Sequence, residues 1–236
     1  MFDLETHNKP ILERGHQTSF VLARWFADAG VARAFHVGYA SGRHVFYLTA
    51  MGIECGGTDL PDDVTTWVRI PERALDAATR RRLLRVDFFQ LTPLHLDTLW
   101  TEPGMGPPSV LFSEATFETL LPWRDHGASV PGYLTLGPAA LRSMMHERFP
   151  AKLAELQSCV RNMVFIEPEP TAGGAGEVFR ACAQRLPGFE FRVWRFRPPF
   201  DALFRLSPRY PTRQAVYAFT RDPRLLHALG SYADPL

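Results

Sequence analysis

Cysteine, charge of one sign and long apolar runs are all scarce in this chain of 236 residues. The three cysteines, Cys55, Cys159 and Cys182, are far apart and lack the spacing of metal ligands. We therefore expect no metal site, and we interpret the cysteines as buried free thiols of a reducing compartment. Lysine and arginine (26) nearly balance aspartate and glutamate (25), so net charge favours neither nucleic acid nor a membrane surface as partner.

No apolar run approaches the roughly 20 residues that a membrane-spanning helix needs. The first residues, which include Asp3 and Glu5, lack the apolar segment of a signal peptide. We therefore expect a cytoplasmic protein. Apolar residues make up 46% and charged residues 22% of the chain, which is the balance of a globular protein. The length fits one α/β domain over residues 1–236.

Short apolar runs alternate with segments of helical periodicity along the chain. This order predicts βα units, and hence a Rossmann-like, seven-stranded and mostly parallel sheet with helices on both faces. The last two predicted strands have no helical segment between them, which favours an antiparallel last strand. We expect a core over 18–220, an N-terminal arm or lid over 1–17, and an insertion over the site at 122–138. The predicted strands are 34–38, 53–60, 84–89, 109–113, 163–166, 189–196 and 215–220, and the predicted helices are 18–29, 42–51, 71–82, 139–160 and 177–186.

A glycine-containing segment, residues 35–43, lies between a predicted strand and a predicted helix, with Ser41 as the expected helix cap. Glycines at such a turn let the backbone pass close to a ligand, and the free N–H groups of the helix point toward it. Asp59 follows the next predicted strand, where an acid can accept hydrogen bonds from ribose hydroxyls. The combination predicts a site for a nucleoside-containing cofactor.

Two cofactor classes use this geometry. The dinucleotide pattern G-x-G-x-x-G requires glycine where Arg43 stands, which speaks against a dinucleotide enzyme. The run Gly-Tyr-Ala-Ser-Gly-Arg over 38–43 instead resembles the first motif of class I S-adenosylmethionine-dependent methyltransferases. Asp59 is similar to the family's ribose-binding acid, and the resemblance covers about residues 18–220.

The resemblance implies S-adenosylmethionine as cofactor and assigns residues to it. Asp87 and Phe88, after the third predicted strand, would contact the adenine amino group and ring, and Ser113 and Glu114 would lie beside the transferred methyl group. The remaining implied cofactor residues belong to the glycine segment and to the end of the second strand: His36, Gly38, Tyr39, Ala40, Ser41, Gly42, Asp59 and Leu60.

Two residues depart from the family pattern. His36 stands where family members usually carry an acid that contacts the amino-acid end of the cofactor, and Ala40 replaces the middle glycine. A neutral imidazole can accept a hydrogen bond from the cofactor's ammonium group, whereas a protonated one repels it. Cofactor affinity is therefore expected to be weaker than usual and to fall as pH drops through about 6.5.

The leading hypothesis is methyl transfer to the oxygen or nitrogen of a small molecule, in small-molecule metabolism of the bacterial type. A general base would help a hydroxyl acceptor, and the candidates are His16, Glu114 and His126. The alternatives are a catalytically silent methyltransferase-like binding or partner subunit and a nucleotide-dependent Rossmann enzyme. Ordinary structural roles also stay open: His36 as a core histidine, Asp59 and Asp87 as turn residues, and His16 as a solvated histidine before the first helix.

Overall fold

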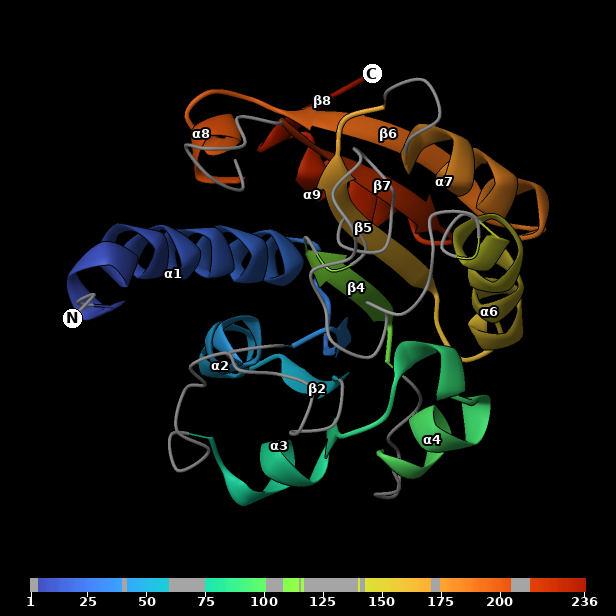
Figure 1. Ribbon diagram of the computed structural model, residues 1–236, viewed down its shortest axis with the longest axis horizontal. Helices are drawn as coiled ribbons and strands as arrows, with labels where there is room; N and C mark the ends of the chain where they lie inside the picture. Colours follow the sequence, from blue (N-terminus) through green and yellow to red (C-terminus); the bar gives the residue numbers. More distant parts are fainter. Residues whose placement is uncertain are drawn as a thin grey trace.

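The computed structural model describes residues 4–39, 42–59, 75–100, 108–114, 116, 140, 143–170, 175–204 and 213–236, with the backbone alone for 4–14. One sheet runs through the described part of the chain in the order β3-β2-β1-β4-β5-β7-β6-β8 (Figure 1). Its strands are β1 (Arg33–Val37), β2 (Glu54–Thr58), β3 (Leu83–Leu84), β4 (Val110–Glu114), β5 (Asn162–Pro168), β6 (Glu190–Phe196), β7 (Gln214–Thr220) and β8 (Ala233–Pro235).

The directions of the strands confirm the predicted class of sheet. β3, β2, β1, β4 and β5 are parallel neighbours, and β7 runs antiparallel to both β5 and β6. The seven predicted strands are all present, and the short β8 adds an eighth at the edge, antiparallel to β6. Because the first five strands are parallel, their carboxyl ends meet at one edge of the sheet, where the predicted site residues follow them.

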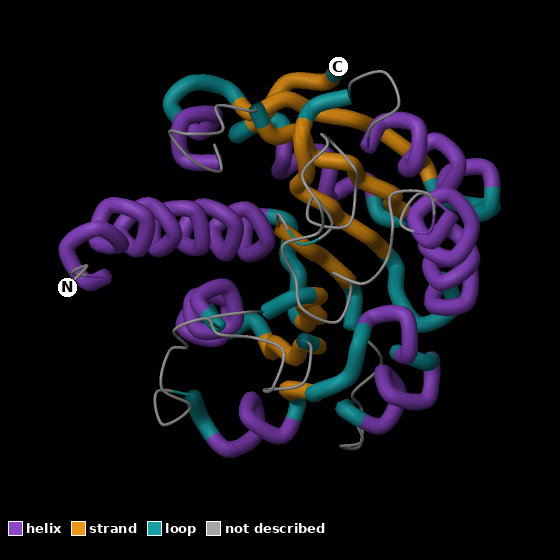
Figure 2. The backbone as a smooth tube through the Cα atoms, in the orientation of Figure 1, coloured by secondary structure: helices purple, strands orange, loops and turns teal. Residues whose placement is uncertain are grey.

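Helices cover both faces of the sheet (Figures 1 and 2). α1 and α2 lie on one face, and α4, α6 and α7 lie on the other, while the N-terminal end of α1 extends beyond the sheet. Residues 144–148 form a π-helical turn that leads into α6. The helices are α1 (Leu4–Asp28), α2 (Arg43–Ala50), α3 (Ala77–Arg81), α4 (Pro93–Thr98), α6 (Phe149–Leu156), α7 (Ala175–Gln184), α8 (Phe200–Phe204) and α9 (Pro223–Leu229).

Two buried clusters, one on each face, hold these layers together. Along β1, Phe35 and Val37 belong to the cluster under α6 and α7, whereas Ala34 belongs to the cluster under α1 and α2. This alternation is the two-residue period of a strand. Burial of each large apolar side chain contributes about 1.5–3 kcal/mol, so the two clusters dominate the stability of the fold. The three cysteines are buried free thiols, as predicted.

Several predicted boundaries were wrong. Helix α1 begins at Leu4, so residues 4–17 are helical and His16 lies on the helix and not before it; Pro10 removes one backbone donor and does not end the helix. The predicted third strand, 84–89, ends after Leu84 because Asp87 caps a 3₁₀ turn, Phe88–Gln90. The predicted helix 139–160 ends at Leu156, with Pro150 in the first turn of α6. Of the helix predicted at 71–82 the described part is α3, and the predicted insertion 122–138 lies outside the described residues.

Candidate functional site

The turn between β1 and α2 has the backbone geometry that the glycines predicted. Gly38 has φ 72° and Gly42 has φ 76°, which is the left-handed region that only glycine adopts at little cost. The Gly42 N–H donates to the Tyr39 carbonyl at 2.7 Å and closes the turn. Gly42 itself is the N-cap of α2 and makes no side-chain cap, so the prediction of Ser41 as cap was wrong. The backbone, not a side chain, shapes this end of the helix.

Space at Gly38 is also restricted. A Cβ atom added there would lie 2.5 Å from the Thr116 side chain, whose hydroxyl donates to the Val37 carbonyl at 3.1 Å. Thr116 follows β4, so the end of the fourth strand closes over the end of the first. This contact explains why residue 38 must be glycine for steric reasons as well as for its φ angle.

The acids predicted to bind ribose and adenine both lie at the carboxyl edge. Asp59 follows β2, and its N–H donates to the Leu84 carbonyl at 3.2 Å. The Asp87 carboxylate accepts a hydrogen bond from the Phe89 N–H at 2.8 Å, so it has the turn-capping role left open above. Phe88 is only 7% exposed and packs on Phe149 with ring centroids 5.7 Å apart. Its role at the adenine ring stays a prediction.

The Tyr39 ring belongs to the core. It is 4% exposed, it packs against Gly57 of β2, where an added Cβ would lie 3.1 Å from the ring, and the Arg85 guanidinium lies over the ring, 5.3 Å from its centroid. A cofactor could therefore contact the backbone of Tyr39 but not the face of its ring.

His36 is buried beneath the turn. Its ring stacks on Phe112 of β4, with centroids 4.4 Å apart, and meets the edge of His44 at 4.9 Å. Neither ring nitrogen has a hydrogen-bond partner in the described parts of the chain. Burial, and then the positive charges of His44 and Arg43, lower the pKa of His36 well below its usual value of 6.5. The imidazole is neutral near pH 7, and the pH window predicted from an ordinary histidine moves below 6.5.

Glu114 and His44 form a hydrogen-bonded pair above His36. His44 Nε2 lies 2.8 Å from Glu114 Oε2, and since a carboxylate can only accept, the imidazole donates. Burial raises the pKa of Glu114, but the hydrogen bond from His44 and the charges of His44 and Arg43 outweigh burial and hold this pKa below its usual value. The carboxylate is therefore a fixed negative charge at the end of β4.

A second buried acid lies at the same edge, on the opposite face of the sheet from Glu114. Glu167, near the end of β5, is fully buried and its Oε1 accepts a hydrogen bond from the Thr116 N–H at 3.2 Å. Ser113, on the opposite face of β4 from Glu114, is also fully buried. The carboxyl edge thus carries His36 and Glu114 on one face of the sheet and Ser113 and Glu167 on the other.

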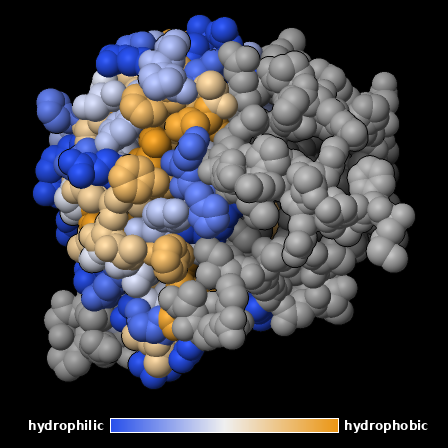
Figure 3. Space-filling view, turned by 90° about the vertical axis from the view of Figure 1, so that its left-hand side faces the viewer, coloured by the Kyte–Doolittle hydropathy of each residue, from blue (hydrophilic) through white to orange (hydrophobic). Residues whose placement is uncertain are grey.

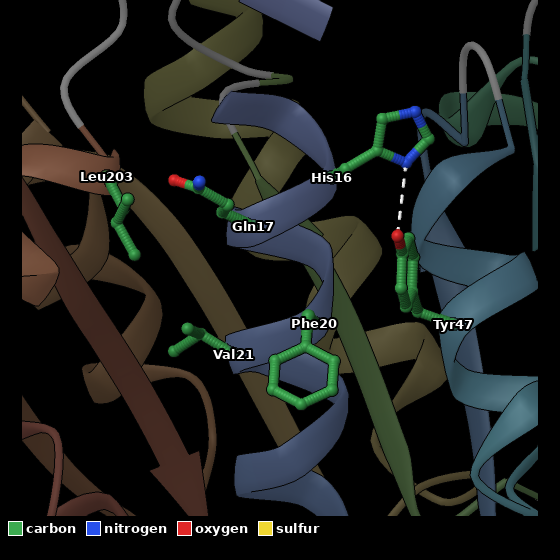
Figure 4. A pocket seen from close by; sticks show the side chains of 6 residues that line it. All are labelled: His16, Gln17, Phe20, Val21, Tyr47 and Leu203. Carbon is green, nitrogen blue, oxygen red and sulfur yellow. Dashed lines mark hydrogen bonds between the residues drawn. The ribbon is translucent and has the colours of Figure 1, made fainter. Parts of the chain in front are cut away.

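His16 lies in an outer groove rather than in this cluster. The groove has a volume of about 390 Å³ and runs between α1, α2 and α8 (Figure 4). His16 Nδ1 lies 3.3 Å from the Tyr47 hydroxyl, and Phe20 contacts the same tyrosine ring edge-on. Phe20 is 50% exposed, and the face of the molecule that carries α1 and α2 shows apolar surface between hydrophilic areas (Figure 3). The neighbouring Gly15 packs on the Arg43 side chain, so the groove adjoins the start of α2.

Of the predicted site residues, Ala40, Ser41, Leu60 and His126 lie outside the described residues. The sequence analysis missed His44 and Glu167. Glu167 carried a usable signal, because a charged residue directly after the apolar run of β5 marks the carboxyl end of a strand. His44 carried none, since only the tertiary fold brings it to Glu114.

Two further searches of the described residues gave negative results. No helix in these ranges is long and apolar enough to cross a bilayer. Within the same ranges, no group of three or more histidine, cysteine, aspartate or glutamate side chains has an arrangement that could hold a metal ion.

Comparison with known proteins supports the fold alone. No protein-family model matches the chain, and no curated protein matches it. Among solved structures, magnesium protoporphyrin IX methyltransferase from Synechocystis PCC 6803 with bound S-adenosylmethionine is similar, with a TM-score of 0.55, 12% identity, and coverage of 93% of this chain and 85% of that one. The same enzyme with bound S-adenosylhomocysteine gives a TM-score of 0.52 at 12% identity, covering 93% of this chain and 89% of that one. The chain therefore has the fold of the class I S-adenosylmethionine-dependent methyltransferases.

Proposed function

We propose that the protein binds S-adenosylmethionine at the carboxyl edge of its sheet and transfers the methyl group to the oxygen or nitrogen of a small molecule. The observation that carries the proposal is the turn from Gly38 to Gly42, with two left-handed glycines, at the end of β1. Asp59 at the end of the neighbouring β2 adds the acid that a ribose needs. The similar solved structures hold S-adenosylmethionine or S-adenosylhomocysteine.

The described residues fit such a cofactor. Gly38 and Gly42 bring no side chain to the turn, and α2 begins directly after Gly42, so its first N–H groups point toward the turn. Glu114 supplies a negative charge for a ligand that carries a sulfonium and an ammonium. Bound there, S-adenosylmethionine supplies a methyl group that is already electrophilic.

The protein's own contribution would be alignment and the exclusion of water. Glu114 and His16 are the described candidates for a general base toward a hydroxyl acceptor. Glu114 lies at the end of β4 beside the turn, and His16 lies in the outer groove next to Gly15. The nearly balanced charge of the chain favours a small acceptor over nucleic acid.

The test is calorimetric binding of S-adenosylhomocysteine to the parent protein and to Asp59→Ala. Charge-assisted hydrogen bonds contribute about 1.5–3 kcal/mol, so the variant is expected to bind about ten- to a hundredfold more weakly. Asp97→Ala, an exposed aspartate on α4, is the matched control and should bind like the parent. Equal affinity of folded Asp59→Ala and parent would reject the ribose role.

A binding or partner subunit without activity is the second candidate, and the loss of the acid at His36 favours it. Mass spectrometry of small molecules retained by the purified protein separates the two when it is followed by incubation with labelled S-adenosylmethionine and candidate acceptors. Retained S-adenosylhomocysteine, the product of methyl transfer, supports the enzyme. Binding of S-adenosylmethionine without turnover on any acceptor supports the partner subunit.

A further inference from the structure

The missing acid at position 36 raises the question of which group receives the ammonium of the cofactor. His36 is 2% exposed, and both of its nitrogens are buried. Its ring is fixed between Phe112 and His44. A ligand above the turn could reach this imidazole only if these rings separated, so His36 is a poor substitute for the acid.

The neighbouring strand offers a carboxylate at the same place. In the parallel register of β1 and β4, His36 pairs with Phe112, so Glu114 lies two residues further toward the carboxyl edge. Residues two apart on a strand project from the same face, which places Glu114 on the face that carries His36. Its side chain is 20% exposed and lies one step above the buried histidine.

His44 fixes the position of that carboxylate. It belongs to the first turn of α2, directly after the glycine turn, and it donates through Nε2 to Glu114 Oε2 at 2.8 Å. A carboxylate has about four acceptor positions, so one hydrogen bond from His44 leaves room for the donors of an ammonium group. The pair also explains why His44, a polar residue, is buried: its ring packs against His36 and its nitrogen is used by Glu114.

We propose that Glu114, positioned by His44, binds the ammonium group at the amino-acid end of the cofactor, in place of the acid that the first strand lacks. Compared with the family pattern, the negative charge therefore lies at the end of β4 instead of the end of β1. Glu114 is the contacting residue, and His44 is a positioning residue that acts through it. This inference rests on the proposed function, because it needs a ligand with a nucleoside and an amino-acid end.

The experiment compares two ligands by calorimetry. S-adenosylhomocysteine carries the amino-acid end, whereas 5′-methylthioadenosine has the same nucleoside and thioether but no amino acid. Glu114→Gln keeps the shape of the side chain and removes its charge, so it should bind S-adenosylhomocysteine about ten- to a hundredfold more weakly. Its affinity for 5′-methylthioadenosine should equal that of the parent. Glu190→Gln, which removes an exposed carboxylate at the start of β6, is the matched control for both ligands.

His44 is tested by two variants with the same pair of ligands. His44→Phe keeps an aromatic ring against His36 and removes the hydrogen bond, so binding of S-adenosylhomocysteine should weaken by about two- to tenfold. His44→Gln places an amide donor near the former Nε2 position and should restore the affinity. Neither variant should change binding of 5′-methylthioadenosine. If the role of His44 were purely structural, His44→Phe would weaken the binding of both ligands, and His44→Gln would not restore the affinity.

The outcomes separate this inference from the function beneath it. If the parent binds neither ligand, the proposed function and the inference both fall. If the parent binds both ligands, the proposed function stands. The inference is then overturned if Glu114→Gln weakens the binding of both ligands equally, or weakens the binding of neither. The inference is also overturned if His36→Ala, and not Glu114→Gln, weakens S-adenosylhomocysteine alone.

Discussion

The two edges of the parallel strands differ in how far their buried polar side chains are hydrogen-bonded. At the amino edge, the Asn162 side chain donates to the Ser109 carbonyl at 3.1 Å and accepts from the Thr220 hydroxyl. Trp25 Nε1 of α1 donates to the Leu225 carbonyl at 3.1 Å. Each of these hydrogen bonds joins segments that are far apart in the sequence, so the amino edge is fastened by side chains.

At the carboxyl edge, buried polar atoms are left over. Both nitrogens of His36, Nδ1 of His44 and the Ser113 hydroxyl have no hydrogen-bond partner among the residues that the structure describes. An unpaired buried polar group costs about 1–3 kcal/mol. Native structures pair the large majority of such groups, so each exception calls for an explanation. The comparison shows that the amino edge pairs the polar side chains named above, whereas these four polar atoms at the carboxyl edge stay unpaired among the described residues.

The largest expected difference between two matched variants comes from removing a polar group at the amino edge. Asn162→Ala loses two buried hydrogen bonds, and we expect the free energy of unfolding to fall by about 1–3 kcal/mol. Ser113→Ala is the matched change at the carboxyl edge, where no bond is lost, and it should leave stability unchanged or raise it. Chemical denaturation of both variants measures the difference. Equal losses in the two variants would remove the distinction between the edges.

A smaller difference between two matched variants, about 1–2 kcal/mol, is expected where the carboxyl edge is closely packed. Gly38→Ala combines a left-handed φ of 72° with a clash on Thr116, whereas Gly30→Ala has nearly the same φ, 70°, and nothing within 4 Å. Both changes have the backbone cost of about 1–2 kcal/mol. The clash should add about 1–2 kcal/mol for Gly38 alone, since small-to-large changes at packed sites cost about 1–3 kcal/mol.

Thr116→Ala tests whether the clash with Thr116 causes the excess cost of Gly38→Ala. Thr116→Ala removes the two atoms that would lie 2.5 Å from the new Cβ, so the excess cost of Gly38→Ala should shrink in the double variant. Thermal or chemical denaturation measures the stability of the parent, Gly38→Ala, Thr116→Ala and the double variant. If Gly30→Ala and Gly38→Ala cost the same, Thr116 does not close over the turn.

Much of the fold was predictable from the sequence because its signals are local. The apolar runs of β1, β4 and β5 and the glycine at residue 38 are readable as strand and turn without tertiary information. The third strand was overextended because Val86 to Phe89 has strand-forming residues, while Asp87 bonds its own backbone and ends the strand early. The missed helices α4, α8 and α9 are seven residues or shorter, so helical periodicity had too little length to show.

The site was predictable in its backbone and less so in its side chains. The turn, Asp59 and Glu114 follow strands directly, so sequence order places them at one edge. The protonation state of His36 depends on its contacts with Phe112 and His44, which belong to a different strand and to a helix. Residue type suggested a titrating group near pH 6.5, but burial, which only the fold reveals, lowers the pKa and keeps the ring neutral.

The smallest expected effect is a pH dependence of stability that comes from His36. In the unfolded chain its pKa is about 6.5, whereas the folded value is lowered by burial and by the charges of His44 and Arg43. Below pH 6.5 the unfolded state therefore binds the extra proton, so the free energy of unfolding falls as pH decreases. Between pH 7.5 and 5.5 this histidine should account for a loss of up to about 1 kcal/mol.

His36→Phe isolates that contribution, because phenylalanine keeps the stacking on Phe112 and does not titrate. Other ionisable groups contribute equally to parent and variant and cancel in the difference. Urea denaturation at pH 7.5 and 5.5 should show that the parent loses more stability than His36→Phe over this interval, by up to about 1 kcal/mol. His227→Gln, at an exposed position on α9, is the matched control for the loss of one histidine and should behave like the parent. Equal losses in the parent and His36→Phe would mean that the folded protein lets His36 take up a proton, and the carboxyl edge would then be open to solvent beneath its glycine turn.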